Sequence, residues 1–167
     1  KYVAERAVTL ALALLGKVVM FHNALIKGVW NRTDDDDHLW ESIHGRRCGI
    51  LGYGHIGRNI AKLLKAYECK ITGFRKNISS EKDEYADVIT SDLHYVIDNS
   101  DLVFVCLPLN AETKDLINAQ ILQKMKGKYI INVGRGATIN EEALYNSLKS
   151  GILTGAALDV WYNYPGK

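Results

Sequence analysis

The chain has 167 residues, of which 47% are hydrophobic and 24% charged, with 14 Gly and 2 Pro. This composition is typical of one globular domain and excludes a disordered chain or a collagen-like repeat. The net charge is +2 and the basic residues are scattered, so we expect no nucleic acid partner. The three cysteines, Cys48, Cys69 and Cys106, lie far apart without metal-ligand spacing. They predict free core thiols in a reducing, cytoplasmic compartment.

The first predicted element is a long apolar helix over Tyr2 to Val29. Apolar residues surround this helix between Ala7 and Phe21, so either the core of the same chain or a second subunit in a homodimer must cover it. Its longest apolar stretch, Ala7 to Gly16, is shorter than the about 20 residues that span a bilayer. The charged residues Glu5 and Arg6 before that stretch do not suit a signal peptide. We therefore expect no membrane segment.

A polar segment with an acidic run, NRTDDDD over Asn31 to Asp37, follows this helix. Four successive carboxylates do not converge on one point, as the ligands of a cation must. We therefore expect a solvated loop here and no metal site anywhere in the chain.

From Arg47 onward, short apolar runs alternate with helix-like segments. In chain order these are Cys48–Leu51, Ile56–Tyr67, Ile71–Phe74, Val88–Thr90, Leu93–Asp98, Leu102–Leu107, Ala119–Met125, Tyr129–Val133, Glu141–Ser150 and Ala156–Val160. Continuous apolar runs are typical of strands buried on both faces, and their alternation with helices implies parallel strands with right-handed crossovers. The pattern predicts an α/β fold with a doubly wound parallel sheet of about six strands.

A glycine-rich sequence, GYGHIG over residues 52–57, follows the first strand and opens the next helix. In this setting Gly52 allows a tight turn, Gly54 lets the backbone approach a pyrophosphate, and Gly57 lets helix and strand pack closely. The helix N-terminus adds free N–H groups and the positive end of the helix dipole. The sequence therefore predicts a Rossmann-like dinucleotide site.

The end of the second strand distinguishes NAD from NADP, because NAD-binding units place an Asp or Glu there to bind the ribose 2′-hydroxyl. This chain instead has Arg75 and Lys76, followed by Ser79 and Ser80. Cations and hydroxyls suit a phosphate, so we predict that NADP is preferred to NAD. In the alternative interpretation, Arg75 stacks on the adenine and both cofactors are accepted.

Two long segments of the second half resemble the cofactor domain of the D-isomer-specific 2-hydroxyacid dehydrogenases. They are DLVFVCLPLNAETKDLIN from Asp101 and KGKYIINVGRGATINEEALYNSLKSGILTGAALDV up to Val160. The resemblance implies hydride transfer between NAD(P)H and a small 2-keto or 2-hydroxy acid. In that family a second, substrate-binding domain is made from both ends of a longer chain. We therefore expect residues 1–167 to be a dinucleotide-binding domain that is nearly inactive alone.

The resemblance also implies roles for individual residues. Arg135, in the segment NVGRG, corresponds to the catalytic arginine that binds the substrate carboxylate and polarises its carbonyl. A planar guanidinium at the end of a strand can bind a 2-keto acid through two hydrogen bonds. Further cofactor contacts are implied for His55 and Ile56 at the pyrophosphate, Leu107 and Pro108 at the nicotinamide, Asp159 at the carboxamide, and Thr113 and Val133.

The sequence departs from the family pattern near its last residues. Tyr164 stands where the family has a glutamate before Pro165, and none of the five histidines replaces the catalytic histidine, which the family places beyond Lys167. Tyr162 or Tyr164 could bond that histidine instead, although a neutral phenol would not raise its pKa as a carboxylate does. A phosphite-type dehydrogenase and a dinucleotide-sensing regulator on the same scaffold are the alternative functions.

Overall fold

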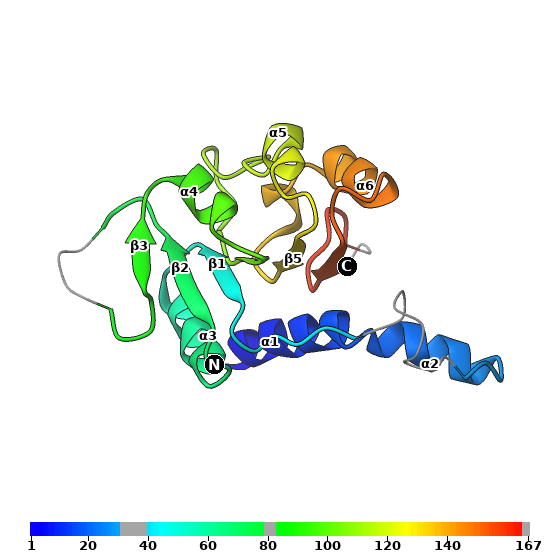
Figure 1. The fold of residues 1–167 in the computed structure, drawn as a ribbon. Coiled ribbons are helices and arrows are strands. Elements are labelled where there is room, and N and C mark those ends of the chain that lie inside the picture. The colour runs from blue at the N-terminus through cyan, green and yellow to red at the C-terminus, as the bar shows by residue number, and fades with distance from the viewer. Residues whose placement is uncertain (31–39, 79–82, 165–167) are drawn as a thin grey trace.

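The computed structural model describes residues 1–30, 40–78 and 83–164 and contains one six-stranded sheet flanked by helices (Figure 1). The elements are α1 (Tyr2–Leu15), α2 (Val18–Ile26), β1 (Arg47–Leu51), α3 (His55–Lys65), β2 (Lys70–Phe74), β3 (Val88–Thr90), α4 (Leu93–Asp98), β4 (Leu102–Val105), α5 (Ala119–Gln123), β5 (Tyr129–Asn132), α6 (Glu141–Lys149) and β6 (Gly155–Leu158). All strands are parallel, in the order β3-β2-β1-β4-β5-β6. The predicted doubly wound α/β fold is confirmed.

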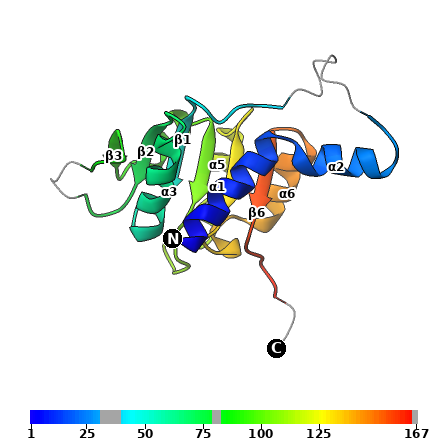
Figure 2. The ribbon, with the colours of Figure 1, turned by 90° about the horizontal axis from the view of Figure 1, so that it is seen from below.

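The sheet separates two apolar cores, because successive side chains of a strand point to opposite faces. On β4, Leu102 and Phe104 join the core beneath α1 and α3, whereas Val103 and Val105 join the core beneath α4, α5 and α6. All four side chains are fully buried. Figure 2 shows α1 and α3 lying across one face of the sheet. Burial on both faces explains why the strands lack the alternation of a half-exposed sheet.

The predicted single helix over Tyr2 to Val29 is wrong, because two helices occupy this segment. Lys17 has φ 49°, in the left-handed region, which interrupts the helical hydrogen bonding after Gly16. The helix axis therefore bends by 57° between α1 and α2. Five residues of α1 are buried, whereas none of α2 is. Taken singly, no helix of the described chain is long and apolar enough to cross a membrane; only the bent pair α1 and α2 together reaches that length and apolarity.

The three cysteines are free thiols, with Cys48 and Cys69 buried and Cys106 partly exposed. Burial raises the pKa of Cys106 to about 12, which keeps this sulfur a thiol at neutral pH. The predicted acidic loop Asn31 to Asp37, the hydroxyls of Ser79 and Ser80, and Pro165 lie outside the described residues.

Candidate functional site

A cleft of about 480 Å³ opens at the carboxyl ends of the first four strands. The chain runs from β1 to β2 on one side and later enters β4 on the other, so the strand order reverses between β1 and β4. Ligands of open α/β sheets bind in the crevice at such a switch point. The cleft is lined by Gly52, Tyr53, Gly54, Phe74, Arg75, Lys76, Ser91, Cys106, Leu107, Pro108, Asn110, Glu112, Thr113 and Leu116.

Glycines are required at two positions of the loop between β1 and α3. Gly52 has φ 93°, and a Cβ atom there would lie 2.9 Å from the carbonyl carbon of Cys106 after β4. A Cβ atom on Gly57, in the first turn of α3, would lie 2.7 Å from the Gly52 carbonyl oxygen and 2.9 Å from Ile50. These contacts bring β1, β4 and the start of α3 closer together than any other residue would allow.

The N-terminus of α3 faces open space. A Cβ atom on Gly54, the N-cap residue, would meet no atom within 4 Å. The first N–H groups of a helix have no partner inside the helix and attract anions. His55 and Ile56, the first two residues of α3, are exposed. The backbone here therefore suits a phosphate group, and the residues present fit a dinucleotide.

Tyr53, between the first two glycines, points into the protein and is 3% exposed. Its ring lies over Gly73 of β2, where a Cβ atom would be only 2.6 Å from the ring. Its hydroxyl donates a hydrogen bond to Asp83 Oδ1 at 2.7 Å, and Arg58 Nε donates to Asp83 Oδ2 at 2.9 Å. The glycine loop, α3 and the segment before β3 are thus connected through one carboxylate.

Burial of the Asp83 carboxyl would raise its pKa, but the hydrogen bonds from Tyr53, the Tyr85 N–H and Arg58 outweigh burial and lower the pKa below its usual value. Burial and the neighbouring Asp83 both raise the pKa of Tyr53. Asp83 is therefore ionised and Tyr53 neutral at physiological pH, as their hydrogen bond requires.

The two cations after β2 both contact other protein groups. Arg75 Nε donates to the carbonyl oxygen of Asn77 in its own turn. Lys76 Nζ lies 2.7 Å from Glu112 Oε1, which comes from the loop after β4. Both cations line the cleft, so the structure places them where the sequence predicts the ribose end of a dinucleotide.

Side-chain hydrogen bonds hold the loop after β4 in one shape. Thr113 Oγ1 donates to the Pro108 carbonyl at 2.6 Å and accepts from the Asn110 N–H at 2.9 Å. Asn110 Oδ1 accepts from the N–H groups of Glu112 and Thr113 at 2.9 and 3.0 Å. Thr113 thus closes the loop, and Leu107 before it is buried.

Arg135 lies in a turn that follows β5, and its side chain is exposed. Buried Asn132 holds this turn, because its Oδ1 accepts from the Gly134 N–H at 3.0 Å and its Nδ2 donates to the Arg135 carbonyl at 3.1 Å. Thr138 Oγ1 donates to the same carbonyl at 2.7 Å. The Arg135 backbone is therefore fixed while its guanidinium, which bonds only the Gly134 carbonyl among the described residues, reaches outward.

Two more close approaches join the Arg135 turn to its neighbours. A Cβ atom on Gly134 would lie 2.6 Å from the Leu107 carbonyl oxygen, and one on Gly136 would lie 2.4 Å from the Trp161 carbonyl oxygen. The Arg135 turn thus touches the cleft loop on one side and the segment after β6 on the other. Asp159 in that segment accepts a hydrogen bond from Arg6 of α1 at 2.9 Å.

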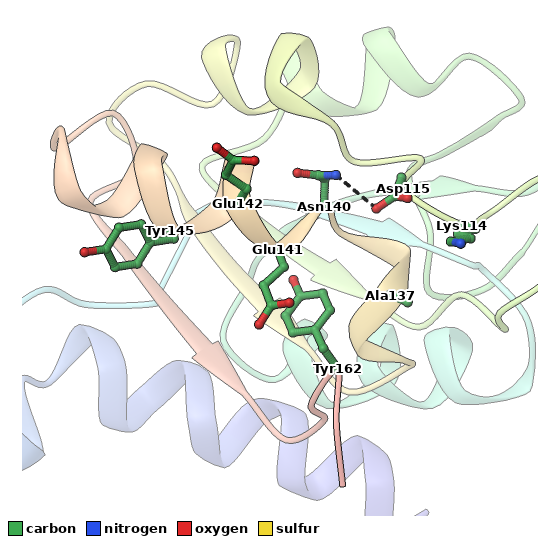
Figure 3. Close-up of a pocket in the computed structure, with 8 residues that line it drawn as sticks. All are labelled: Lys114, Asp115, Ala137, Asn140, Glu141, Glu142, Tyr145 and Tyr162. Atoms are coloured by element: carbon green, nitrogen blue, oxygen red, sulfur yellow. Dashed lines mark hydrogen bonds between the residues drawn. The ribbon is translucent and has the colours of Figure 1, made fainter.

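A second hollow, of about 590 Å³, lies beside α6 (Figure 3). Three carboxylates line it, from Asp115, Glu141 and Glu142, with Lys114 as the one cation. This charge opposes an anionic dinucleotide or keto acid. Tyr162 points into this hollow next to Glu141 (Figure 3). Burial is the main cause that raises the pKa of Tyr162 to about 12, and the nearby carboxylates of Glu141 and Asp115 add to it. Tyr164 instead accepts a hydrogen bond from the Trp161 N–H at 3.3 Å.

The cleft thus brings together seven of the residues predicted from the sequence: Gly52, Gly54, Arg75, Lys76, Leu107, Pro108 and Thr113. His55, Ile56 and Gly57 lie at the adjoining helix N-terminus, and Val133, Arg135 and Asp159 lie beyond the cleft at the ends of β5 and β6. Sequence reasoning missed Asp83, Glu112 and Asn132. Only Asn132 had a signal, as a polar residue that ends an apolar strand.

Comparisons with known proteins agree with this geometry. The family model described as D-isomer specific 2-hydroxyacid dehydrogenase, NAD binding domain, matches residues 8–167. Glycerate dehydrogenase of Methylorubrum extorquens is 34% identical to the chain over 169 residues, which cover 99% of the chain and 51% of that enzyme.

Solved structures also match the chain over nearly its whole length. NAD-dependent formate dehydrogenase from Staphylococcus aureus, in complex with NAD, has a TM-score of 0.88 and 30% identity over 99% of this chain and 50% of its own. An acyclic imino acid reductase in complex with NADPH and D-Arg has a TM-score of 0.86 and 29% identity over 97% of this chain and 51% of its own. The chain therefore spans about half the length of each of these three proteins.

Proposed function

The chain belongs to the family of NAD-binding domains of D-isomer specific 2-hydroxyacid dehydrogenases, and we propose that it is the dinucleotide-binding part of an enzyme that interconverts a small 2-keto acid and its D-2-hydroxy acid. The observation that carries this proposal is the glycine-loop cleft at the switch point of the sheet, adjoined by the exposed Arg135. In the proposal, sequence outside residues 1–167 forms the substrate-binding domain. Hydroxypyruvate is the substrate that we would assay first, because the similar glycerate dehydrogenase is named for its reduced form.

The proposed dinucleotide occupies the cleft with its pyrophosphate at Gly54 and the N-terminus of α3. The open space at Gly54 and the free N–H groups of the first helical turn support this placement. The adenosine lies between β2 and the loop after β4, and the nicotinamide lies beyond Leu107 and Pro108, toward Arg135. When bound, the dinucleotide supplies or accepts the hydride.

In the proposal, Arg135 is the residue that stabilises negative charge on the substrate. Its guanidinium binds the substrate carboxylate and polarises the carbonyl at C2, where negative charge develops on the oxygen as the hydride arrives. Asn132 and Thr138 act as positioning residues because they fix the Arg135 backbone. No histidine in the described chain lines the cleft. The proposal therefore assigns the proton transfer to a histidine outside residues 1–167, as the family resemblance implies.

We further propose that NADP(H) is preferred to NAD(H). Between β2 and residue 78 the chain has no carboxylate to bind a ribose 2′-hydroxyl, whereas Arg75 and Lys76 present two cations to the cleft. A charge-assisted hydrogen bond contributes about 1.5–3 kcal/mol, which corresponds to roughly ten- to a hundredfold in affinity. This range sets the expected preference for a 2′-phosphate.

Calorimetric titration with NADPH and NADH tests the proposal. We expect NADPH to bind the protein about tenfold more tightly than NADH, and Arg75→Asp to reverse that order. Lys126→Asp reverses the charge of an exposed residue before β5, away from the cleft, and should leave the order unchanged. Equal or tighter binding of NADH to the unmodified protein contradicts the NADP preference, and failure of both nucleotides to bind contradicts the dinucleotide site.

We also propose that the protein forms a homodimer in which the N-terminal helices of two copies pack together. α2 exposes Val18, Val19, Leu25 and Ile26 and has no buried residue within one chain. Exposed apolar faces of this kind mark interaction surfaces. Sedimentation velocity measures the assembly directly, and a monomer at all concentrations up to about 100 times those of the assay rules out this dimer.

A further inference from the structure

The ion pair between Lys76 and Glu112 spans the mouth of the glycine-loop cleft. Lys76 follows β2 and Glu112 follows β4, and these strands lie on opposite sides of β1. Because neighbouring strands lie about 4.8 Å apart, the pair reaches across roughly 10 Å, over the carboxyl end of β1. Both residues line the cleft, and Lys76 Nζ is 2.7 Å from Glu112 Oε1.

Hydrogen bonds in the loop after β4 hold the backbone from which the Glu112 side chain extends. The Glu112 N–H donates to Asn110 Oδ1 at 2.9 Å, and Thr113 closes the loop by donating to the Pro108 carbonyl. Since the backbone on both sides of Glu112 is held in this way, the loop presents the carboxylate to the cleft before any ligand binds.

This carboxylate opposes a phosphate more than a hydroxyl. A phosphate monoester such as the 2′-phosphate of NADPH carries a charge of about −1.5 to −2 at neutral pH. To contact Lys76, it must replace Glu112 as the partner of the ammonium and then lie beside a like charge. The neutral 2′-hydroxyl of NADH meets neither obstacle. Arg75, the other cation of this turn, already contacts Asn77.

We propose that Glu112 is a specificity-determining residue that lowers the affinity of the cleft for NADPH relative to NADH by competing for Lys76. The inference rests on the proposed dinucleotide function but not on the NADP preference. It concerns the ratio of the two affinities, whichever nucleotide the unmodified protein prefers. Lys76 and Glu112 thus have opposite effects on the ratio although they form one ion pair.

Calorimetric titration of the protein with NADPH and NADH at low ionic strength, on Glu112→Gln and Lys76→Gln, tests this proposal. We expect Glu112→Gln to raise the ratio of NADPH to NADH affinity by about three- to tenfold, and Lys76→Gln to lower it. The rise should shrink at high salt, because exposed charges are screened. Glu68→Gln is the matched control, because Glu68, before β2, is also mostly exposed and its carboxylate lies near His44, away from the cleft.

The opposite changes expected for Glu112→Gln and Lys76→Gln distinguish a role in specificity from a purely structural role. If the ion pair only holds the loop in place, both substitutions remove the same contact and move the ratio in the same direction. That result, or a ratio within twofold of the unmodified protein for Glu112→Gln, overturns the role of Glu112 while the dinucleotide site stands. If the unmodified protein binds neither nucleotide, the proposed function fails and this inference fails with it. Both side chains are more than two-thirds exposed, so the variants should fold, which thermal unfolding verifies.

Discussion

Two turns at the carboxyl edge of the sheet share the pattern Gly-x-Gly but use it differently. Gly52, Tyr53 and Gly54 follow β1, and Gly134, Arg135 and Gly136 come shortly after β5. In the first turn the middle side chain is buried, and in the second it is exposed. The 11-residue helix α3 begins directly after the first turn, whereas the three-residue 3₁₀ turn Gly136–Thr138 is part of the second.

The difference shows which part of each turn is available to a ligand. Where Tyr53 points inward, the turn presents only backbone, namely the N–H groups at the start of α3. Where Arg135 points outward, the glycines on either side fit against Leu107 and Trp161, and the turn presents a side chain. The backbone N–H groups of the first turn can bind an anionic group such as a phosphate whatever it is attached to. The guanidinium of the second turn suits a planar carboxylate.

The largest effect that we expect comes from the exposed side chain of the second turn. Arg135→Gln should lower kcat/KM for hydroxypyruvate reduction by about 10²–10⁴, since two charge-assisted hydrogen bonds of about 1.5–3 kcal/mol each are lost. Dinucleotide affinity and stability should barely change. Arg47→Gln, at the amino end of β1, is the control and should retain activity. Steady-state kinetics of the whole enzyme measure kcat/KM. A decrease of less than tenfold for Arg135→Gln contradicts the proposed role of Arg135.

The next effect tests the backbone of the first turn. Gly52→Ala should lower the free energy of unfolding by about 2–4 kcal/mol, because Ala disfavours φ 93° and its Cβ atom would overlap the Cys106 backbone. Gly54→Ala, with open space around its Cβ atom, should change stability by less than about 1 kcal/mol yet weaken dinucleotide binding. Urea denaturation and calorimetry separate the two, and equal destabilisation by both substitutions would refute this distinction.

The smallest effect concerns Asp83, the carboxylate that accepts the hydrogen bond from the Tyr53 hydroxyl. No carboxylate of the described residues bonds the Arg135 side chain in this way. The lowered pKa of Asp83 stabilises the fold above the unfolded-state pKa of about 3.9, and this stabilisation is lost as pH falls through the lower folded-state pKa. Asp83→Asn should therefore be about 1–3 kcal/mol less stable than the unmodified protein at pH 7, and the difference should shrink below about pH 4. Thermal unfolding across pH measures this. Glu84→Gln, at its exposed neighbour, should show only a small difference at every pH, and a constant gap for Asp83→Asn would exclude the carboxylate as its cause.

Local sequence patterns predicted the elements of the fold, except for the break in the N-terminal helix. Every predicted strand from Cys48 onward lies within two residues of its observed bounds, because burial on both faces leaves continuous apolar runs that are visible in the sequence. The N-terminal helix was predicted as one element because its apolar residues continue past Gly16. The left-handed conformation of Lys17, which separates α1 from α2, left no signal in that pattern.

The glycine loop, the two cations after β2 and Arg135 were recognised from residues that lie close together in the sequence and carry chemistry of their own. Asp83 and Glu112 were not, because each acts through a partner that is about 30 or more residues away, Tyr53 for Asp83 and Lys76 for Glu112. A lone carboxylate in a polar loop looks the same whether it is solvated or paired. Its role is visible only when β2 and β4 are placed on either side of β1.

The sequence by itself therefore determined the α/β class, the parallel strands and the candidate dinucleotide loop, since burial periodicity and the three glycines of GYGHIG are local properties. The tertiary structure decided which side chains meet. It placed the Glu112 carboxylate against Lys76 in the cleft, directed Tyr53 inward to Asp83, and left α2 without a buried residue. These contacts depend on strand order and loop shape, which bring together residues far apart in the sequence.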